Sequence, residues 1–473
     1  MFLYLEWLIF MKEHFVFYDF ETTGKSTKFD QPLQFGAIVT DGTFNEVERI
    51  DIRCQLAPHI LPAPFALHVT RVKPEQTLNK NLPTYFEFAQ KIQKFVSDWS
   101  PACWIGYNSI RFDENIMRQM FYQNLQPDIY STQLSGNTRL DLMKMIFAVY
   151  TEVPGVLDWP IDEKGKISFK LDRLAPENGI NHEQAHDALA DVEATIFLFK
   201  KIKQGAPEFF EKLVKARDKN YISEELKSFK PMALTLRFGN NPPKTYHGCF
   251  CGENLKNKNQ VGFLDFSLNH INDVLHADKT MVEDAVSSSP KKIRSIAVNQ
   301  AETLRALESP TAEMERFCEL ISEAHDFRSL VSTALSERFE SDTLEQLEIE
   351  EKIYNGFYDY SDRDLLEKFQ ISSWEDRLKI IDQFRDDRLR QLGKRLIAFF
   401  APYLLTEQQK SDLSSFIKKR WMTLDNNANW TTVQTVKNDL AKMKDENLDA
   451  QYINDLQNFY TSYISQYDLN LGV

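Results

Sequence analysis

The sequence has no long apolar run and little cysteine, and each absence excludes a class of protein. No stretch approaches the roughly 20 apolar residues that a membrane-spanning helix needs. The five cysteines are thinly spread over 473 residues, which argues against a disulfide framework and predicts a reducing, cytoplasmic location. His247, Cys249 and Cys251 lack the second nearby ligand pair of a structural zinc site, so we interpret them as plain thiols in a strand and turn.

Positive charge is also scarce. Lysine and arginine number 56 against 69 aspartate and glutamate residues, which gives a net charge of −13. A nucleic-acid-binding protein is more simply expected to be basic. However, an enzyme that holds divalent metals must cluster carboxylates, and a binding groove needs only local positive charge. Net charge therefore does not decide whether nucleic acid is the substrate.

The first ten residues are apolar, but they contain Glu6 and lack the basic start and cleavage site of a signal peptide. We expect Met11 to be the usual translation start and predict no export.

The length predicts two or three domains. Residues 12–203 alternate strand and helix patterns, which predicts an α/β domain with a mixed sheet. The expected strands are 15–20, 33–40, 47–56 and 103–107, and the expected helices are 84–99, 113–124, 140–150, 170–177 and 187–203. Residues 204–350 mix helices with strands at 232–238 and 261–266, which predicts an α+β domain that ends in a polar linker. Residues 351–473 are helical throughout and predict a third, all-helical domain.

Asp19 and Glu21 stand two residues apart at the end of the first expected strand. The period of a strand places both side chains on one face. Two neighbouring carboxylates repel each other, and a divalent metal is the usual reason for such a pair. Taken alone, the pair is more often a solvated strand end.

Asp113 follows another expected strand and opens a helix. Taken alone, it is equally well explained as a helix N-cap or as a metal ligand.

His186 and Asp191 lie where the last helix of this region begins. Five residues correspond to roughly 500° of helical rotation, so the two side chains would not share a helix face. We therefore place His186 on the loop before the helix, with Asp187 as its N-cap and Asp191 pointing inward.

Together these three motifs resemble the DEDD exonucleases of the ribonuclease H-like fold. Asp19 and Glu21 match the first motif, Asp113 the second and Asp191 the third, and His186 matches the histidine subclass (DEDDh). Within that group the chain resembles the exodeoxyribonuclease I family over nearly its whole length. The segments that carry this resemblance are 17–22, 31–35, 106–113, 178–180, 186–191 and 354–357. The resemblance implies an exonuclease domain (12–203), an SH3-like domain (204–350) and a helical C-terminal domain (351–473).

Four converging carboxylates suit two Mg²⁺ ions, for which Mn²⁺ is expected to substitute. The predicted ligands are Asp19, Glu21, Asp113 and Asp191. His186 is the candidate general base, because an imidazole can accept a proton near neutral pH. The predicted activity is 3′→5′ hydrolysis of single-stranded DNA to 5′-mononucleotides, in DNA repair and recombination.

Contacts with the substrate are predicted at five residues. The family implies that Glu21 and Thr22 meet the terminal nucleotide, and Lys170 stands where the family usually has an arginine, which keeps the charge but loses the bidentate fork. Asn108 in the second motif is a further candidate. Arg118 could reach the DNA backbone, although a solvated helix face explains it equally well. Among many core phenylalanines and tyrosines, Phe121, Tyr122 and Tyr130 could stack on bases.

The resemblance also implies a monomer that encircles a single strand and docks single-stranded DNA-binding protein. Two other functions stay open. An exoribonuclease that trims RNA 3′ ends would use the same motifs, since these do not read a 2′-OH. An inactive single-strand-binding scaffold would have lost a carboxylate, and all five site residues are intact.

Overall fold

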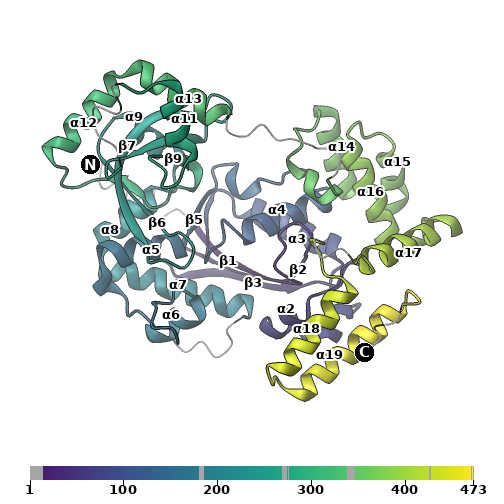
Figure 1. Ribbon diagram of the computed structural model, residues 1–473. Coiled ribbons are helices and arrows are strands. Elements are labelled where there is room, and N and C mark those ends of the chain that lie inside the picture. The colour runs from purple at the N-terminus through teal and green to yellow at the C-terminus, as the bar shows by residue number, and fades with distance from the viewer. Residues whose placement is uncertain are drawn as a thin grey trace.

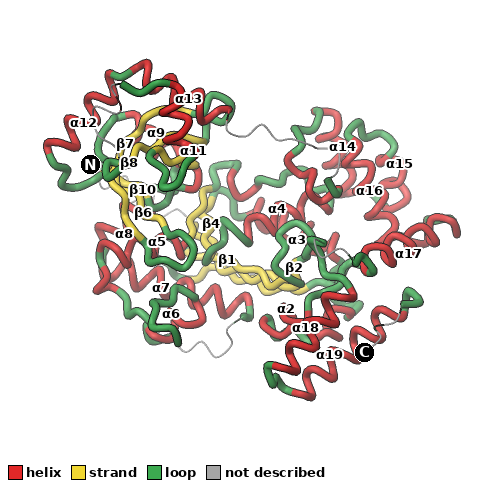
Figure 2. Tube along the Cα trace, viewed as in Figure 1, coloured by secondary structure: helices red, strands yellow, loops and turns green. Residues whose placement is uncertain are grey.

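The computed structural model describes residues 14–180, 186–268, 274, 276–337, 347–424, 428–469 and 471. The expected start at Met11 and part of the expected linker (336–352) lie outside these residues. The chain forms a central α/β region, a second region with its own sheet, and a helical C-terminal region (Figures 1 and 2). This is the predicted α/β fold with a mixed sheet and a helical C-terminal part.

The central sheet has the strand order β3-β2-β1-β4-β5. Its strands are β1 (His14–Thr22), β2 (Pro32–Thr40), β3 (Glu46–Arg53), β4 (Ala102–Gly106) and β5 (Thr138–Asp141). Strand β1 pairs antiparallel with β2 and parallel with β4, so the sheet is mixed as predicted. Strand β5 corrects the expected helix 140–150, because pairing with β4 keeps its four residues extended. The helix begins only after Asp141, whose carboxylate caps it by accepting from the Met143 N–H.

Helices cover both faces of this sheet. They are α2 (Pro64–Val69), α3 (Tyr85–Asp98), α4 (Asp113–Gln123), α5 (Leu142–Glu152), α6 (Leu171–Glu177), α7 (Ala188–Gly205) and α8 (Pro207–Lys215). Alternate residues of β1 enter different cores. Tyr18 joins the core beside α3 and α4, whereas Phe15 and Phe17 pack against Phe199 of α7. Asp19 therefore belongs to the α7 face.

The second region carries an antiparallel sheet of order β10-β6-β7-β8-β9. Its elements are α9 (Lys219–Lys227), β6 (Met232–Leu236), β7 (Lys244–Glu253), β8 (Gln260–Asp265), α11 (Lys279–Ser287), β9 (Ile293–Ala297), β10 (Leu304–Ala306), α12 (Ala312–Glu323) and α13 (His325–Glu337). The expected strands near 232 and 261 are thus confirmed, and the SH3-like assignment stays a prediction. Cys249 and Cys251 are buried free thiols on β7.

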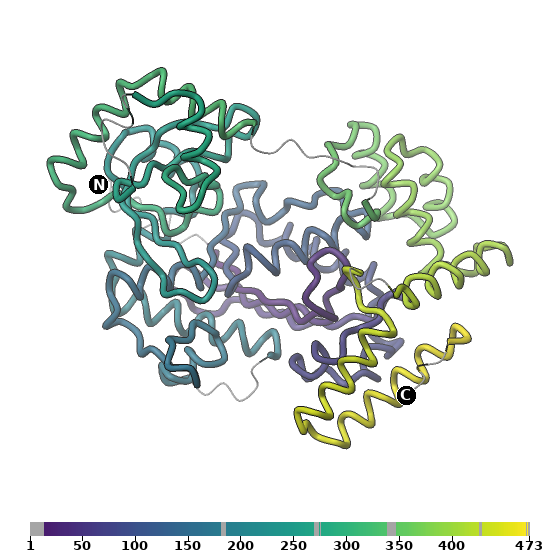
Figure 3. The backbone as a smooth tube through the Cα atoms, viewed as in Figure 1, coloured from purple at the N-terminus to yellow at the C-terminus, as the bar shows by residue number. Residues whose placement is uncertain are grey.

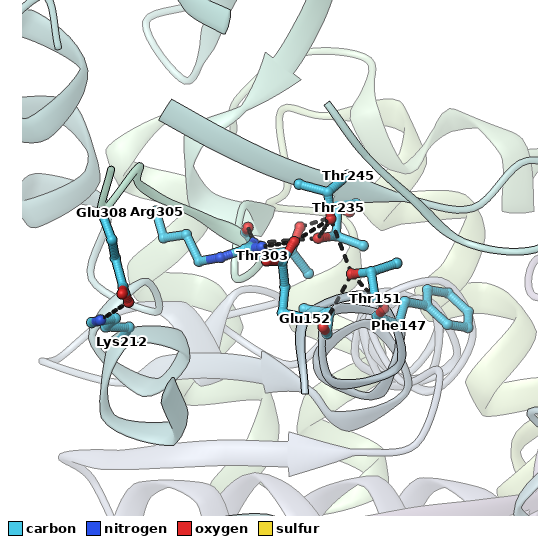
Figure 4. Close-up of polar contacts among 10 residues, drawn as sticks. Phe147, Thr151, Glu152, Lys212, Thr235, Thr245, Thr303, Arg305 and Glu308 are labelled. Atoms are coloured by element: carbon cyan, nitrogen blue, oxygen red, sulfur yellow. Dashed lines mark hydrogen bonds and ion pairs between the residues drawn. The ribbon is translucent and has the colours of Figure 1, made fainter. Parts of the chain in front are cut away.

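Polar contacts join this region to α5 (Figure 4). The Thr245 hydroxyl lies 2.7 Å from Oε1 of Glu152 and 3.0 Å from the hydroxyl of Thr151. The same glutamate pairs with the buried guanidinium of Arg305 at 2.8 Å. A cavity of about 640 Å³ opens beside this ion pair, and Lys212 and Glu308 form a second ion pair on its wall.

The C-terminal helices are α14 (Tyr360–Ile371), α15 (Trp374–Ile381), α16 (Asp387–Phe400), α17 (Glu407–Trp421), α18 (Val433–Asp445) and α19 (Ala450–Ser465). The last of them lie beside α2 of the central region (Figure 3). Trp421 donates its indole N–H to the carbonyl of His59, and Tyr460 donates its hydroxyl to the carbonyl of Pro62. This part of the chain therefore shares a hydrophobic core with the central region. None of the helices in the described ranges combines the length and apolar character needed to cross a membrane.

Gly36 sets how closely α7 approaches the sheet. A Cβ at this position would lie 2.7 Å from the Leu189 nitrogen and 2.8 Å from the Ala188 carbonyl carbon. Gly36 is the register partner of Asp19 on β1. The absence of a side chain at Gly36 thus brings the first turn of α7 next to Asp19.

We predict that Gly36→Ala lowers the free energy of unfolding by about 1–3 kcal/mol, because backbone atoms must move to admit the methyl group. Gly155→Ala is the matched control, since no heavy atom lies within 4 Å of its added Cβ, and it should change stability by less than about 0.5 kcal/mol. Chemical denaturation of both variants measures the difference. Equal stabilities would show that α7 does not depend on this close approach.

Candidate active site

Strand β1 extends past the end of β4, and the first two carboxylates lie on this extension. Pairing between β1 and β4 ends at Phe17 and Ile105, whereas β1 continues to Thr22. Asp19 and Glu21 share one face, as predicted. The other edge of β1 is still covered by β2, so only the β4 side is open to another element.

Asp113 fills that open side. The Phe20 backbone N–H donates to Oδ1 of Asp113 at 3.1 Å, so the carboxylate takes the place of a neighbouring strand. Asp113 is the first residue of α4 and is buried. A carboxylate in the first helical turn also gains from the positive end of the helix dipole. The predicted helix start is confirmed, but Phe112 is the N-cap residue.

His186 and Asp191 come from the start of α7. The Asp187 side chain caps this helix by accepting from the Leu189 and Ala190 N–H groups, as predicted. His186 lies on the preceding turn with φ of 68°, in the left-handed region that non-glycine residues rarely adopt. Its backbone N–H donates to Oδ1 of Asp191 at 3.2 Å, which fixes the histidine beside the third motif.

The carboxylates of Asp19, Glu21 and Asp191 converge. One oxygen atom of each lies within 4.8 Å of the other two. Burial raises the pKa of Asp19 well above its ordinary value, and the charges of Asp113, Asp191 and Glu21 raise it further. Burial and the charges of Asp191 and Asp113 do the same to Glu21. Burial also raises the pKa of Asp113 to about 8, against the lowering effect of the Phe20 N–H.

An all-oxygen ligand set of mutually repelling carboxylates fits a hard divalent cation. A bound cation would remove the repulsion that raises these pKa values. This acidic cluster is therefore suited to a divalent metal.

A group of residues that sequence reasoning gave no role supports the third motif. The Gln34 amide donates to Oδ2 of Asp187 at 3.0 Å and to Oδ1 of Asp51 at 2.9 Å. Arg53 pairs with the same Asp187 oxygen at 2.9 Å. Gln34 is fully buried and is the register partner of Glu21. In the sequence, the polar Gln34 within an otherwise apolar strand was the one indication of this role.

The predicted substrate contacts differ in their surroundings. Thr22 is buried, and its hydroxyl donates to the Gly24 carbonyl. Asn108 has φ of 63°, and its backbone N–H donates to Asp141. Lys170 is exposed just before α6. Their contacts with substrate stay predictions.

Arg118 does not lie on a solvated helix face, since its side chain is 12% exposed and pairs with Glu114 at 3.2 Å. Its contact with DNA stays a prediction. Phe121 and Tyr122 are buried in the protein core, so the idea that they stack on bases is wrong. The Arg118 guanidinium lies over the Tyr130 ring, with its Cζ 5.4 Å from the centre of the ring.

We predict that the metal-free protein loses stability as pH rises from about 4 to about 8. A carboxyl whose folded-state pKa is raised contributes stability below its unfolded value, near 4, and this contribution is lost as pH rises through the folded value. The pKa of about 8 for Asp113 sets the upper end of this window. Melting in EDTA should show a Tm lower by roughly 3 °C or more at pH 8 than at pH 5.

Asp113→Asn should reduce this fall, because it removes a charge but keeps the acceptor for Phe20. Mn²⁺ should restore the stability of the unaltered protein at pH 8. Identical pH profiles for the variant and the unaltered protein, with or without Mn²⁺, would contradict the electrostatic account.

Comparisons with known proteins agree with this geometry. An exonuclease family model matches residues 16–199, and an exonuclease I C-terminal domain model matches residues 347–466. The exodeoxyribonuclease I of Escherichia coli K12 is 29% identical over 80% of this chain and 83% of its own length. That of Buchnera aphidicola subsp. Schizaphis graminum is 27% identical over 86% and 87%. That of Haemophilus influenzae is 39% identical over 44% of each chain.

Solved structures share the whole fold. Escherichia coli exonuclease I in complex with a dA16 oligonucleotide superposes with a TM-score of 0.80 over 96% of this chain and 100% of that one, at 23% identity. A structure of SSB/exonuclease I in complex with the inhibitor CFAM gives 0.79 over 96% and 100%, at 24% identity. Both family models occur in chain order, and relatives named exodeoxyribonuclease I match 80% and 86% of the chain, so this chain is similar to exodeoxyribonuclease I over most of its length.

Proposed function

We propose that this protein is a metal-dependent 3′→5′ exonuclease that degrades single-stranded DNA to 5′-mononucleotides. The convergence of Asp19, Glu21 and Asp191, with Asp113 against the same strand, is the observation that carries the proposal. The likeness to relatives named exodeoxyribonuclease I extends over most of the chain, which favours DNA over RNA as substrate.

The four carboxylates would hold two Mg²⁺ ions, with Mn²⁺ as a substitute. Such ions would supply Lewis-acid chemistry at these carboxylates, by lowering the pKa of an attacking water and offsetting charge on the leaving 3′ oxygen. His186 is the general base, which takes the proton of that water. His186 lies on the turn before α7, where its backbone N–H donates to Asp191. Hydrolysis breaks the bond between phosphorus and the 3′ oxygen of the remaining strand. The released nucleotide therefore keeps its 5′ phosphate.

Substrate binding is assigned to Glu21, Thr22 and Asn108 near the terminal nucleotide, and to Lys170 and Arg118 along the phosphates. Lys170 is exposed and can approach a phosphate as a point charge. Arg118 already forms an ion pair with Glu114, so it would contact Glu114 and a phosphate at the same time.

The protein is further proposed to act as a cytoplasmic monomer in DNA repair and recombination, with single-stranded DNA-binding protein as a partner. The solved relative in complex with a dA16 oligonucleotide supports single-stranded DNA as a binding partner. The SSB/exonuclease I structure supports single-stranded DNA-binding protein as the second partner. The second and helical regions flank the central region, an arrangement suited to surrounding a strand (Figure 1).

We predict that matched 3′-labelled and 5′-labelled single strands lose the 3′ label first, with DNA degraded faster than RNA, in Mg²⁺ but not in EDTA. Asp191→Ala should lower kcat by roughly 10³-fold, since metal stabilisation is worth several kcal/mol. The exposed Asp412 on α17 offers a control, and Asp412→Ala should keep full activity. Faster loss of RNA would overturn the substrate, and tight binding without turnover would make the protein a binding module.

We also predict that His186→Ala lowers kcat by about 10²- to 10⁴-fold, because it removes the base that accepts the water proton. Mn²⁺ binding by calorimetry should be unchanged, since His186 is not a proposed ligand. His276→Ala, at an exposed histidine, should behave as the unaltered protein. Retained activity in His186→Ala would assign the proton transfer to another group.

A further inference from the structure

A buried carboxylate lies directly behind the candidate metal site. Glu114 follows Asp113 in α4, and its side chain is 1% exposed. Its Oε1 accepts from the Tyr18 hydroxyl at 3.0 Å. Its Oε2 accepts from the Thr132 hydroxyl at 3.0 Å and from Arg118 and Arg139 at 3.2 Å each. Four donors on one carboxylate make this the centre of a closed polar cluster inside the protein.

Two of the four donors, Tyr18 on β1 and Arg118 on α4, come from elements that bear proposed metal ligands. Tyr18 immediately precedes Asp19 on β1, and Arg139 lies on β5, two residues before Asp141. Glu114 therefore ties the first turn of α4 to β1 at the level of Asp19. Asp113 is then held from both sides, by Glu114 behind it and by the Phe20 N–H in front.

The charges within the cluster are paired. The guanidinium groups of Arg118 and Arg139 both pair with the Glu114 carboxylate. Their side chains are 12%, 4% and 1% exposed for Arg118, Arg139 and Glu114, so solvent screens these charges weakly. Pairing with the two guanidinium groups therefore offsets the negative charge of Glu114 next to Asp113.

We propose that Glu114 is a positioning residue, which holds Asp113 and Asp19 at metal-binding distance through Tyr18, Thr132, Arg118 and Arg139. This inference rests on the proposed metal-dependent function of the same site. Arg139 extends the cluster to the second region, since its other nitrogen donates to the Asn299 carbonyl at 3.2 Å. Arg139 therefore connects the second region to the Glu114 cluster beside the proposed metal site.

Replacing Glu114 itself would leave two buried arginines without their carboxylate partner and could unfold the protein. The test therefore removes single donors. Tyr18→Phe and Thr132→Val each delete one hydroxyl without changing the side-chain shape much. Thr132→Ser keeps the hydroxyl and serves as the rescue variant. Tyr122→Phe is the control on α4 itself, because it deletes an equally buried hydroxyl that donates to the Ile349 carbonyl, away from the metal ligands.

Mn²⁺ binding to the full chain without DNA is measured by calorimetry, and kcat and KM are measured on a single-stranded DNA oligonucleotide. Loss of a group that supports a metal ligand typically costs 10- to 100-fold in affinity or activity. Tyr18→Phe and Thr132→Val should weaken Mn²⁺ binding at least tenfold and lower kcat, with KM for the strand unchanged. Thr132→Ser and Tyr122→Phe should match the unaltered protein, and Tm should fall no further in Tyr18→Phe than in Tyr122→Phe.

Unchanged Mn²⁺ affinity in both Tyr18→Phe and Thr132→Val would overturn the positioning role. Equal losses in Tyr122→Phe would also overturn it, since any buried hydroxyl of α4 would then matter. If the unaltered protein binds Mn²⁺ but does not degrade DNA, the proposed function fails. The metal-binding comparison would still decide the role of Glu114.

Discussion

Repulsion among buried and half-buried carboxylates is the constraint around which the active-site region is built. Asp19, Glu21 and Asp191 converge within 4.8 Å, and Asp113 lies against the same strand. Burial raises the pKa values of Asp19, Glu21 and Asp113, and the charges of neighbouring carboxylates raise them further. Three features position these carboxylates: β1 extends past β4, Gly36 admits the start of α7, and hydrogen bonds to Glu114 connect the start of α4 to β1. A divalent cation bound among these carboxylates would offset their mutual repulsion.

The helical C-terminal region contributes to the same support. Phe29, on the loop that follows Glu21 and Thr22, packs against Trp430, with their ring centres 5.3 Å apart. The Arg420 guanidinium lies over both rings. Lys28 of the same loop pairs with Glu351. Together with the shared hydrophobic core, these contacts make the end of the chain part of the scaffold that shapes the site, in addition to any role in surrounding the strand.

Much of this arrangement could be predicted from the sequence, because it depends on local patterns. The strand period placed Asp19 and Glu21 on one face, and helix geometry placed His186 on a turn with Asp187 as the cap. The roles of Gln34, Arg53 and Glu114 could not be predicted, since each depends on partners far along the chain. Strand β5 was missed for the same reason: only pairing with β4 keeps residues 138–141 extended. Arg118 was ambiguous until its buried partner Glu114 was known.

The central claim is that Asp19, Glu21, Asp113 and Asp191 form a metal site at the end of β1. Anomalous diffraction from crystals of the protein grown with Mn²⁺ tests it most directly. The account predicts a strong anomalous peak at about 2.0–2.3 Å from carboxylate oxygens of Asp19, Glu21 and Asp191, within the range of oxygen ligands to such ions. A strong peak elsewhere, with none among these three side chains, would contradict the account.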